Sequence, residues 1–323
     1  MTILFQIFLL IIGFVLLIKG ADLFVDGASS TATNFRVPKT LIGLTIIAFG
    51  TSAPELAVSI KALASGSTDM VLGNVIGSNI LNILLILGLA ALIHPLSIKS
   101  DTIKKEIPIC ILISTLLVTL FLDVELKSGS ADLITRSDGI TILLFFAVFL
   151  YYLISMATKG RKKEKNKKEK PKWKLGKSLL FTLIGLLGII FGSNFVVDSA
   201  SEIATLVGVS ERVIALTVIA LGTSLPELVT TVVAARKGET GLVLGNILGS
   251  NIFNICVVLG IPVAIFGTVT PESFAALDLV ALVGSALLLF VFSLTKHKIS
   301  RLESGLMFAA FLVYYTLVFL API

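Results

Sequence analysis

The chain is poor in the residues that build disulfide frameworks and soft-metal sites. Its 323 residues include two cysteines, two histidines and one tryptophan, and only 14% are charged, against about 25% in a typical soluble domain. Cys110 and Cys256 lie in separate apolar runs, which indicates neither a disulfide framework nor a cysteine metal site. His94 and His297 are too far apart in sequence to form a His-Glu-x-x-His metalloprotease motif. These absences argue against an enzyme.

Apolar residues, by contrast, are abundant. They make up 56% of the chain, the mean hydropathy is +1.03, and the apolar runs repeatedly reach the length that spans a bilayer. The sequence therefore predicts an all-α, multi-pass protein of the cell membrane, which is the cytoplasmic membrane if the source is prokaryotic. The ten predicted transmembrane helices cover residues 3–25, 38–63, 70–93, 104–122, 139–158, 175–199, 211–235, 241–266, 274–295 and 303–320.

One strongly basic run, Lys159 to Lys177, separates the fifth and sixth predicted helices. Such a run is typical of a solvated linker, and it favours contact with anionic lipid over a nucleic-acid partner. We therefore predict a first repeat over residues 1–158, a basic cytoplasmic linker over 159–174 and a second repeat over 175–323. Most Lys and Arg residues fall in cytoplasmic loops if both termini lie outside, as the positive-inside rule favours.

The two halves of the chain repeat each other at a displacement of 172 residues. The stretch IIGFVLLIKGADLFVDGAS starts at Ile11, and LIGLLGIIFGSNFVVDSAS starts at Leu183. The same displacement carries Glu55 to Glu227 without any insertion. Five helices per half, an odd number, would insert the second copy upside down. This inverted-repeat plan is typical of secondary transporters, whose sites lie where the repeats meet.

Each repeat contains a helix-breaking motif, LTIIAFGTSAPELAVS in the first and LTVIALGTSLPELVTT in the second. Pro54 and Pro226 lack an N–H group and clash with the preceding turn, which predicts a break or kink around Thr51 and Thr223. Unpaired backbone carbonyls are tolerated within a membrane only where protein buries them or where they line a polar cavity. A bound cation would accept their lone pairs.

Glu55 and Glu227 each follow such a proline by one residue, in the middle of an apolar run. A charge there costs about 2.5–3.5 kcal/mol or more, and two facing carboxylates would repel each other unless a cation lay between them. A single intramembrane glutamate can instead be protonated and bonded to a neighbouring helix. Two repeat-related copies beside two breaks favour the cation.

A second repeated motif reads LGNVIGSNILNILLILG and LGNILGSNIFNICVVLG. Ser78 and Asn82 share a helix face, as do Ser250 and Asn254. Taken alone, the motif is also compatible with simple helix packing. Together the two motifs offer hard oxygen ligands, which suit Ca²⁺ and Na⁺; these would be transported ions, and no cofactor is expected. The predicted metal-binding residues are Glu55, Glu227, Asn82, Asn254, Ser52, Ser224, Ser78 and Ser250, with carbonyls near Ala48, Thr51, Ala220 and Thr223.

The paired GTSAPEL and GTSLPEL stretches, each followed by a GSNI-x-N segment, resemble the two alpha repeats of the sodium/calcium exchanger family, within the calcium/cation antiporter superfamily. The resemblance covers nearly the whole chain and is closest to short prokaryotic members. It implies Na⁺/Ca²⁺ exchange by alternating access, with the first and sixth helices sliding against the other eight. By motif position, Glu55 and Glu227 would bind both ions. The carbonyls of Thr51 and Thr223 would assist, and Ser52, Ser224, Ser78, Ser250, Ala48 and Ala220 would complete flanking Na⁺ sites.

One departure from the family pattern concerns Asn254. Some members, including the potassium-dependent branch, carry Asp there, and because an amide lacks that charge we expect K⁺-independent transport. The alternatives are antiport of Ca²⁺ or another divalent cation against protons and, with less support, a cation channel. Serine chemistry would need a base near Ser52 or Ser224, and no histidine lies close in sequence. No obligate protein partner is indicated.

Overall fold

The computed structural model describes residues 3–122, 133–164, 170–208, 220–270 and 276–320. The regular structure of the described residues is helical, apart from one antiparallel pair of two-residue strands, β1 (Leu96–Ser97) and β2 (Lys298–Ile299), and an isolated bridge between Ile134 and Val269. In the first repeat the helices are α1 (Ile3–Phe35), α2 (Lys39–Ile42), α3 (Ala48–Thr51), α4 (Ala53–Ala64), α5 (Thr68–Leu81), α6 (Gly88–Ile93), α7 (Ile107–Phe121) and α9 (Arg136–Glu164). In the second they are α10 (Leu175–Leu206), α12 (Ala220–Thr223), α13 (Leu225–Arg236), α14 (Thr240–Phe253), α15 (Gly260–Phe266), α16 (Ala276–Leu294) and α17 (Arg301–Leu320).

Several of these helices are continued by π-helical segments, in which the backbone hydrogen bonds join residues five apart and not four apart. They are η1 (Gly43–Ile47), η2 (Asn82–Leu87), η3 (Thr102–Glu106) and η5 (Asn254–Leu259). The segments η2 and η5 are repeat mates, and each begins at an asparagine that the sequence analysis selected. π-helical turns occur frequently at functional sites.

The prediction of an all-α membrane protein is confirmed. Seven described helices are long and apolar enough to cross a membrane, and the pair Lys39–Thr51 and Ala53–Ala64, bent by 45°, makes an eighth. Helix is also present over most of the predicted span 104–122, in η3 and α7. Of the predicted span 211–235, residues 211–219 lie outside the described residues. Helix α9 continues through Glu164, past the predicted helix end at residue 158.

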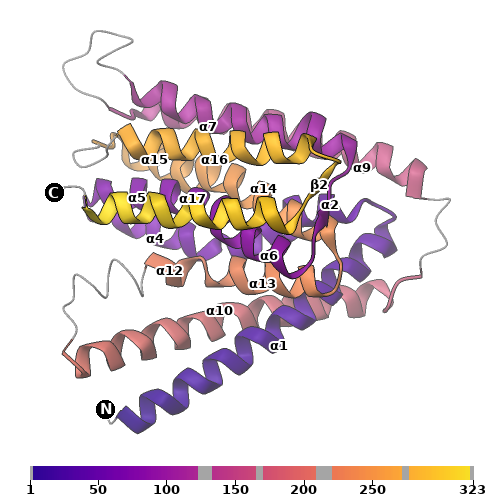
Figure 1. Ribbon diagram of the computed structural model, residues 1–323, viewed down its shortest axis with the longest axis horizontal. Helices are drawn as coiled ribbons and strands as arrows, with labels where there is room; N and C mark the ends of the chain where they lie inside the picture. The colour runs from indigo at the N-terminus through magenta and orange to yellow at the C-terminus, as the bar shows by residue number, and fades with distance from the viewer. Residues whose placement is uncertain (1–2, 123–132, 165–169, 209–219, 271–275, 321–323) are drawn as a thin grey trace.

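The two longest helices, α1 and α10, lie side by side along one edge of the molecule (Figure 1). Glycines bring their backbones into contact. A Cβ atom on Gly185 would lie 2.4 Å from the backbone nitrogen of Phe24, and one on Gly192 would lie 2.6 Å from that of Leu17. Their repeat mates Gly13 and Gly20 face α10 in the same way. Such close packing of small residues is typical of helix pairs in membranes.

The centre of the molecule is built from equivalent helices of both repeats. The spans Thr68–Ile93 and Thr240–Phe266 are the most buried of the candidate spans. In their apolar 18-residue stretches, 72% and 89% of the residues are buried. Helix α14 packs along α2, η1 and α3 of the first repeat, α4 contacts η5, and α13 contacts η2. Each broken helix of one repeat therefore lies against the π-helical segment of the other.

Candidate functional site

The broken helices have the same local geometry in both repeats. Ser52 separates α3 from α4 with φ −86° and ψ 7°, and Ser224 separates α12 from α13 with φ −88° and ψ 4°. Proline lies in the first turn of each following helix, where its missing N–H group is tolerated because that position has no intrahelical partner. The breaks fall one residue beyond Thr51 and Thr223, as the motif predicts to within a residue.

Each break places a glutamate in the first turn of the next helix, at the interface between the repeats. Glu55 on α4 and Glu227 on α13 are both 1% exposed, and they are close enough for their charges to interact. The Ser52 hydroxyl donates a hydrogen bond to Glu227 Oε1 at 3.0 Å. Thr223 and Ser224 lie beside Glu55 in turn. The hydroxyl pair of each repeat therefore faces the carboxylate of the other repeat.

The two asparagines that begin η2 and η5 are held by their amide nitrogens. Asn82 Nδ2 donates to Asn251 Oδ1 at 3.0 Å, and Asn254 Nδ2 donates to the hydroxyl of Ser78 at 3.0 Å. Both asparagines are buried. Because each amide nitrogen is engaged across the repeat interface, each amide oxygen stays available as an acceptor.

Unsatisfied oxygens are concentrated among the predicted site residues. A buried acceptor without a partner costs about 1–3 kcal/mol, and more if it is charged. A set of such oxygens contributed by both repeats is what a bound cation would satisfy. The buried oxygens without a hydrogen-bond partner include both carboxylate oxygens of Glu55, Oε2 of Glu227, Oδ1 of Asn82 and Asn254, and the hydroxyls of Ser224 and Ser250.

Other predicted ligands are engaged within the protein. The Ser78 hydroxyl donates to the carbonyl of Asn74 at 2.6 Å, and the Ala48 carbonyl accepts from the Ser52 N–H group at 3.0 Å. Ala220 and Thr223 are the first and last residues of α12. The ligand roles of the twelve selected residues stay predictions.

Two asparagines outside the predicted set position the motif residues. Asn74 Nδ2 donates to the Glu55 carbonyl at 3.0 Å. Its repeat mate Asn246 donates to the Thr231 hydroxyl at 2.9 Å and accepts from the Thr51 hydroxyl at 3.1 Å. Both asparagines stand in the repeated LGN triplet of the second motif. Their recurrence at the displacement of 172 residues was a signal that could have identified them.

Neutral oxygens dominate this arrangement. Within the part of the chain that the structure describes, no group of three or more His, Cys, Asp or Glu side chains is placed to hold a metal ion. Two carboxylates surrounded by amides and hydroxyls suit hard cations that also accept neutral oxygen ligands, such as Ca²⁺.

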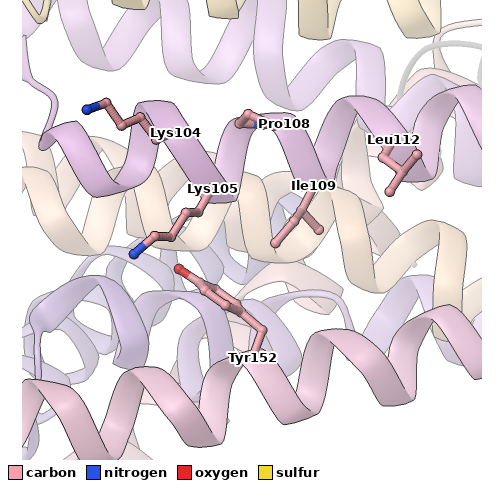
Figure 2. Close-up of a pocket in the computed structure, with 6 residues that line it drawn as sticks. All are labelled: Lys104, Lys105, Pro108, Ile109, Leu112 and Tyr152. Atoms are coloured by element: carbon pink, nitrogen blue, oxygen red, sulfur yellow. The ribbon is translucent and has the colours of Figure 1, made fainter.

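A separate groove of about 310 Å³ lies on the outside of the protein, between η3–α7 and α9 (Figure 2). Lys104 and Lys105 stand at one end, and Tyr152 reaches across from α9 and donates a hydrogen bond to the buried Glu106. None of the predicted ligands lines this groove.

Comparison with known proteins identifies the family of the chain. The family model described as "Sodium/calcium exchanger protein" matches residues 5–155 and 177–320, which include both broken helices and both asparagine motifs. The chain belongs to the sodium/calcium exchanger family. It is similar to CaxA of Alkalimonas amylolytica, at 39% identity over 320 residues that cover 96% of this chain and 97% of that protein. The inner membrane protein YrbG of Escherichia coli is 37% identical over 276 residues, which cover 83% of this chain and 82% of YrbG.

Solved structures of one exchanger share the fold. The sodium-calcium exchanger NCX_Mj, soaked with 10 mM Na⁺ and 10 mM Sr²⁺, aligns over 100% of both chains with a TM-score of 0.84 and 32% identity. Family membership makes this chain a multi-pass membrane antiporter of cations, and it supports Ca²⁺ as one of the ions carried. The expectation that the chain is a transporter and not an enzyme is supported by the same family.

Proposed function

We propose that this family member exchanges Na⁺ for Ca²⁺ across the membrane by alternating access, without a requirement for K⁺. The observation that carries the proposal is the pair of buried carboxylates, Glu55 and Glu227, brought together from the two repeats among unsatisfied neutral oxygens. Two negative charges balance one Ca²⁺ or two Na⁺, so the two ions would compete for one site.

Independence from K⁺ follows from Asn254. Its amide nitrogen donates to Ser78, so the side chain presents a neutral oxygen where a potassium-dependent exchanger would present a carboxylate. With one negative charge fewer, the site has less charge to balance a further monovalent cation.

The proposal extends to the membrane arrangement. We place ten transmembrane helices in two inverted repeats, residues 1–158 and 175–323, joined by a cytoplasmic linker at 159–174, with both termini outside. In this proposal ion transport requires no cofactor and no obligate protein partner. Protease added to inside-out and to right-side-out vesicles tests the orientation. We expect the linker to be cleaved only in inside-out vesicles, whose cytoplasmic face is exposed. Cleavage only in right-side-out vesicles would show that the linker lies outside.

Uptake of radiolabelled Ca²⁺ into proteoliposomes tests the exchange. The vesicles are loaded in turn with Na⁺, with K⁺ or with acidic buffer. We expect an outward Na⁺ gradient to drive uptake, unaltered by added K⁺. Uptake that only a pH gradient drives would assign the proton as counter-ion, since the unpaired oxygens of Glu55 and Glu227 are also able to bind protons. Uptake without any counter-ion gradient would indicate a channel.

The carboxylates are tested in the same assay. Glu55→Gln and Glu227→Gln each remove one charge and keep the shape of the side chain, and we expect either to abolish uptake. Glu202→Gln, on α10 and outside the site, is the matched control and should transport normally. Full activity in both site variants would overturn the assignment of the site.

A further inference from the structure

A second cavity, of about 180 Å³, lies apart from the candidate ion site and none of the predicted ligands lines it. It is formed where the start of α2, the segment that follows β1, and the start of α14 converge. This is the end of the molecule at which α9 finishes and α10 begins (Figure 1). The residues that line it are Thr40, Ser97, Ile98, Lys99, Thr102, Thr240, Gly241 and Leu244.

Two largely buried threonine residues line this cavity. Thr40 and Thr102 are each 3% exposed, both line the cavity, and neither hydroxyl forms a hydrogen bond to any described residue. A threonine so deeply buried ordinarily has a partner for its hydroxyl. These two donors, from different segments of the first repeat, therefore point to a ligand with hydrogen-bond acceptors.

The other groups at the cavity favour a negative charge. Lys99 lines it with an exposed side chain, and the 14-residue helix α14 begins there at Thr240. A helix N-terminus carries a partial positive charge. In α14 the N–H groups of Leu242 and Val243 donate to the Glu239 carbonyl, which leaves those of Thr240 and Gly241 for a ligand. Gly241 keeps the helix start open, because a Cβ atom at that position would lie 3.2 Å from the Thr40 hydroxyl.

Two acidic residues adjoin lining residues in the sequence, and both are paired elsewhere. Asp101, which precedes Thr102, pairs with Lys105 at 3.0 Å. Glu239, which precedes α14, accepts hydrogen bonds from Lys39 at 3.0 Å and from Ser29 at 2.8 Å. No Asp or Glu is among the lining residues. The cavity therefore combines hydroxyl donors, an ammonium group and a helix N-terminus without a carboxylate to oppose an anion.

We propose that this cavity binds a phosphate group, either as inorganic phosphate or as the headgroup of an anionic phospholipid. The bound phosphate would join α2 of the first repeat to α14 of the second. The same two stretches of helix meet again further along, where Thr51 is hydrogen-bonded to Asn246. Occupancy of the cavity would thus stabilise the contact between repeats without supplying any ligand to the transported ions.

Binding of radiolabelled inorganic phosphate to the full chain in detergent tests the proposal, by equilibrium dialysis at constant ionic strength. We expect saturable binding of one phosphate per chain. The double variant Thr40→Val, Thr102→Val removes both hydroxyls at nearly constant shape, and Lys99→Gln removes the charge; each should weaken binding at least about tenfold. Lys298→Gln, on the neighbouring strand β2 but not lining the cavity, is the matched control and should bind as the parent does.

A second arm identifies the source of the phosphate group. In nanodiscs of phosphatidylglycerol, a headgroup ligand would block the binding of inorganic phosphate, whereas nanodiscs of phosphatidylcholine would permit it. Binding that is equal in both lipids assigns the free anion. Absence of saturable phosphate binding in both detergent and phosphatidylcholine, or equal binding by the parent and the cavity variants, overturns the proposal and leaves a water-filled crevice. Ca²⁺-dependent thermal stabilisation should persist in every variant, which verifies folding independently of phosphate.

Discussion

Replacing Ser52 by alanine tests the unequal roles of the two repeat-related serines at the candidate site. Ser52 is fully buried and donates a hydrogen bond to Glu227 Oε1 at 3.0 Å. The other oxygen of Glu227 has no partner, so the substitution removes the Ser52 hydrogen bond and leaves Thr51 as the hydroxyl residue beside this carboxylate. Hydrogen bonds to charged groups contribute about 1.5–3 kcal/mol. We therefore expect Ser52→Ala to lower the ion-free stability by about 2 kcal/mol.

Ser224→Ala is the matched control, because the repeat places this serine at the same backbone position. The Ser224 hydroxyl is buried without a hydrogen-bond partner. The hydroxyl lies beside Glu55 without forming a hydrogen bond of ordinary length, so its removal should lower the ion-free stability by less than Ser52→Ala does, by under about 0.5 kcal/mol. If both hydroxyls are ligands, however, the two substitutions should weaken Ca²⁺ binding to a similar extent.

Thermal unfolding followed by far-UV circular dichroism separates the two effects. In Na⁺-free buffer with a chelator, Ser52→Ala should lower the Tm by roughly 4 °C, while Ser224→Ala should leave it nearly unchanged. Titration calorimetry then compares the Ca²⁺ affinities. An equal fall in the Tm of both variants, measured in the presence of the chelator, would refute the inferred asymmetry. Unchanged Ca²⁺ affinity in both variants would exclude the serines as ligands.

Three further predictions concern charge, packing and ligand removal. Asn254→Asp adds a carboxylate to the buried site, so we expect a loss of about 3–5 kcal/mol of ion-free stability together with tighter Ca²⁺ binding, both measurable by thermal unfolding with and without Ca²⁺. Gly185→Ala should destabilise the chain by about 1–3 kcal/mol, because its Cβ would meet the backbone of Phe24 at 2.4 Å, whereas Gly176→Ala, with open space around it, should be neutral or stabilising in the same assay. Removing Ca²⁺ from a concentration of 100 times Kd should cost about 2.7 kcal/mol of stability, and Glu227→Gln should abolish this difference; a persistent Ca²⁺ effect in that variant would contradict the site.

The internal repeat, together with the apolar runs, was the sequence feature from which most of the fold could be predicted. The apolar runs predict helices wherever the structure describes them, and the glycine and proline of each broken motif fix the bends at Ser52 and Ser224 to within one residue. Proline gives a strong local signal because it removes a backbone donor whatever the surroundings. The equal displacement of all motifs also identified the two repeats before any contact between them was known.

Contacts across the repeats were beyond prediction from the sequence. The spacing of Ser78 and Asn82 places them on one helix face, but it does not show that the partner of Ser78 is Asn254, 176 residues away. Likewise, nothing in the paired motifs distinguishes Ser52, which is hydrogen-bonded, from the unpartnered Ser224. Long-range partners depend on how the helices pack, and a symmetric sequence pattern does not reveal where that packing becomes asymmetric.

Each half places its hydroxyl residues beside the carboxylate of the other, and under the proposed function this limits how the chain can be divided. A fragment cut within the linker would keep one acidic side chain and lose the groups that surround it. Two fragments produced separately would each be inert, and transport would return only when they assemble in one bilayer. An ancestor half as long would, for the same reason, have worked only as a pair.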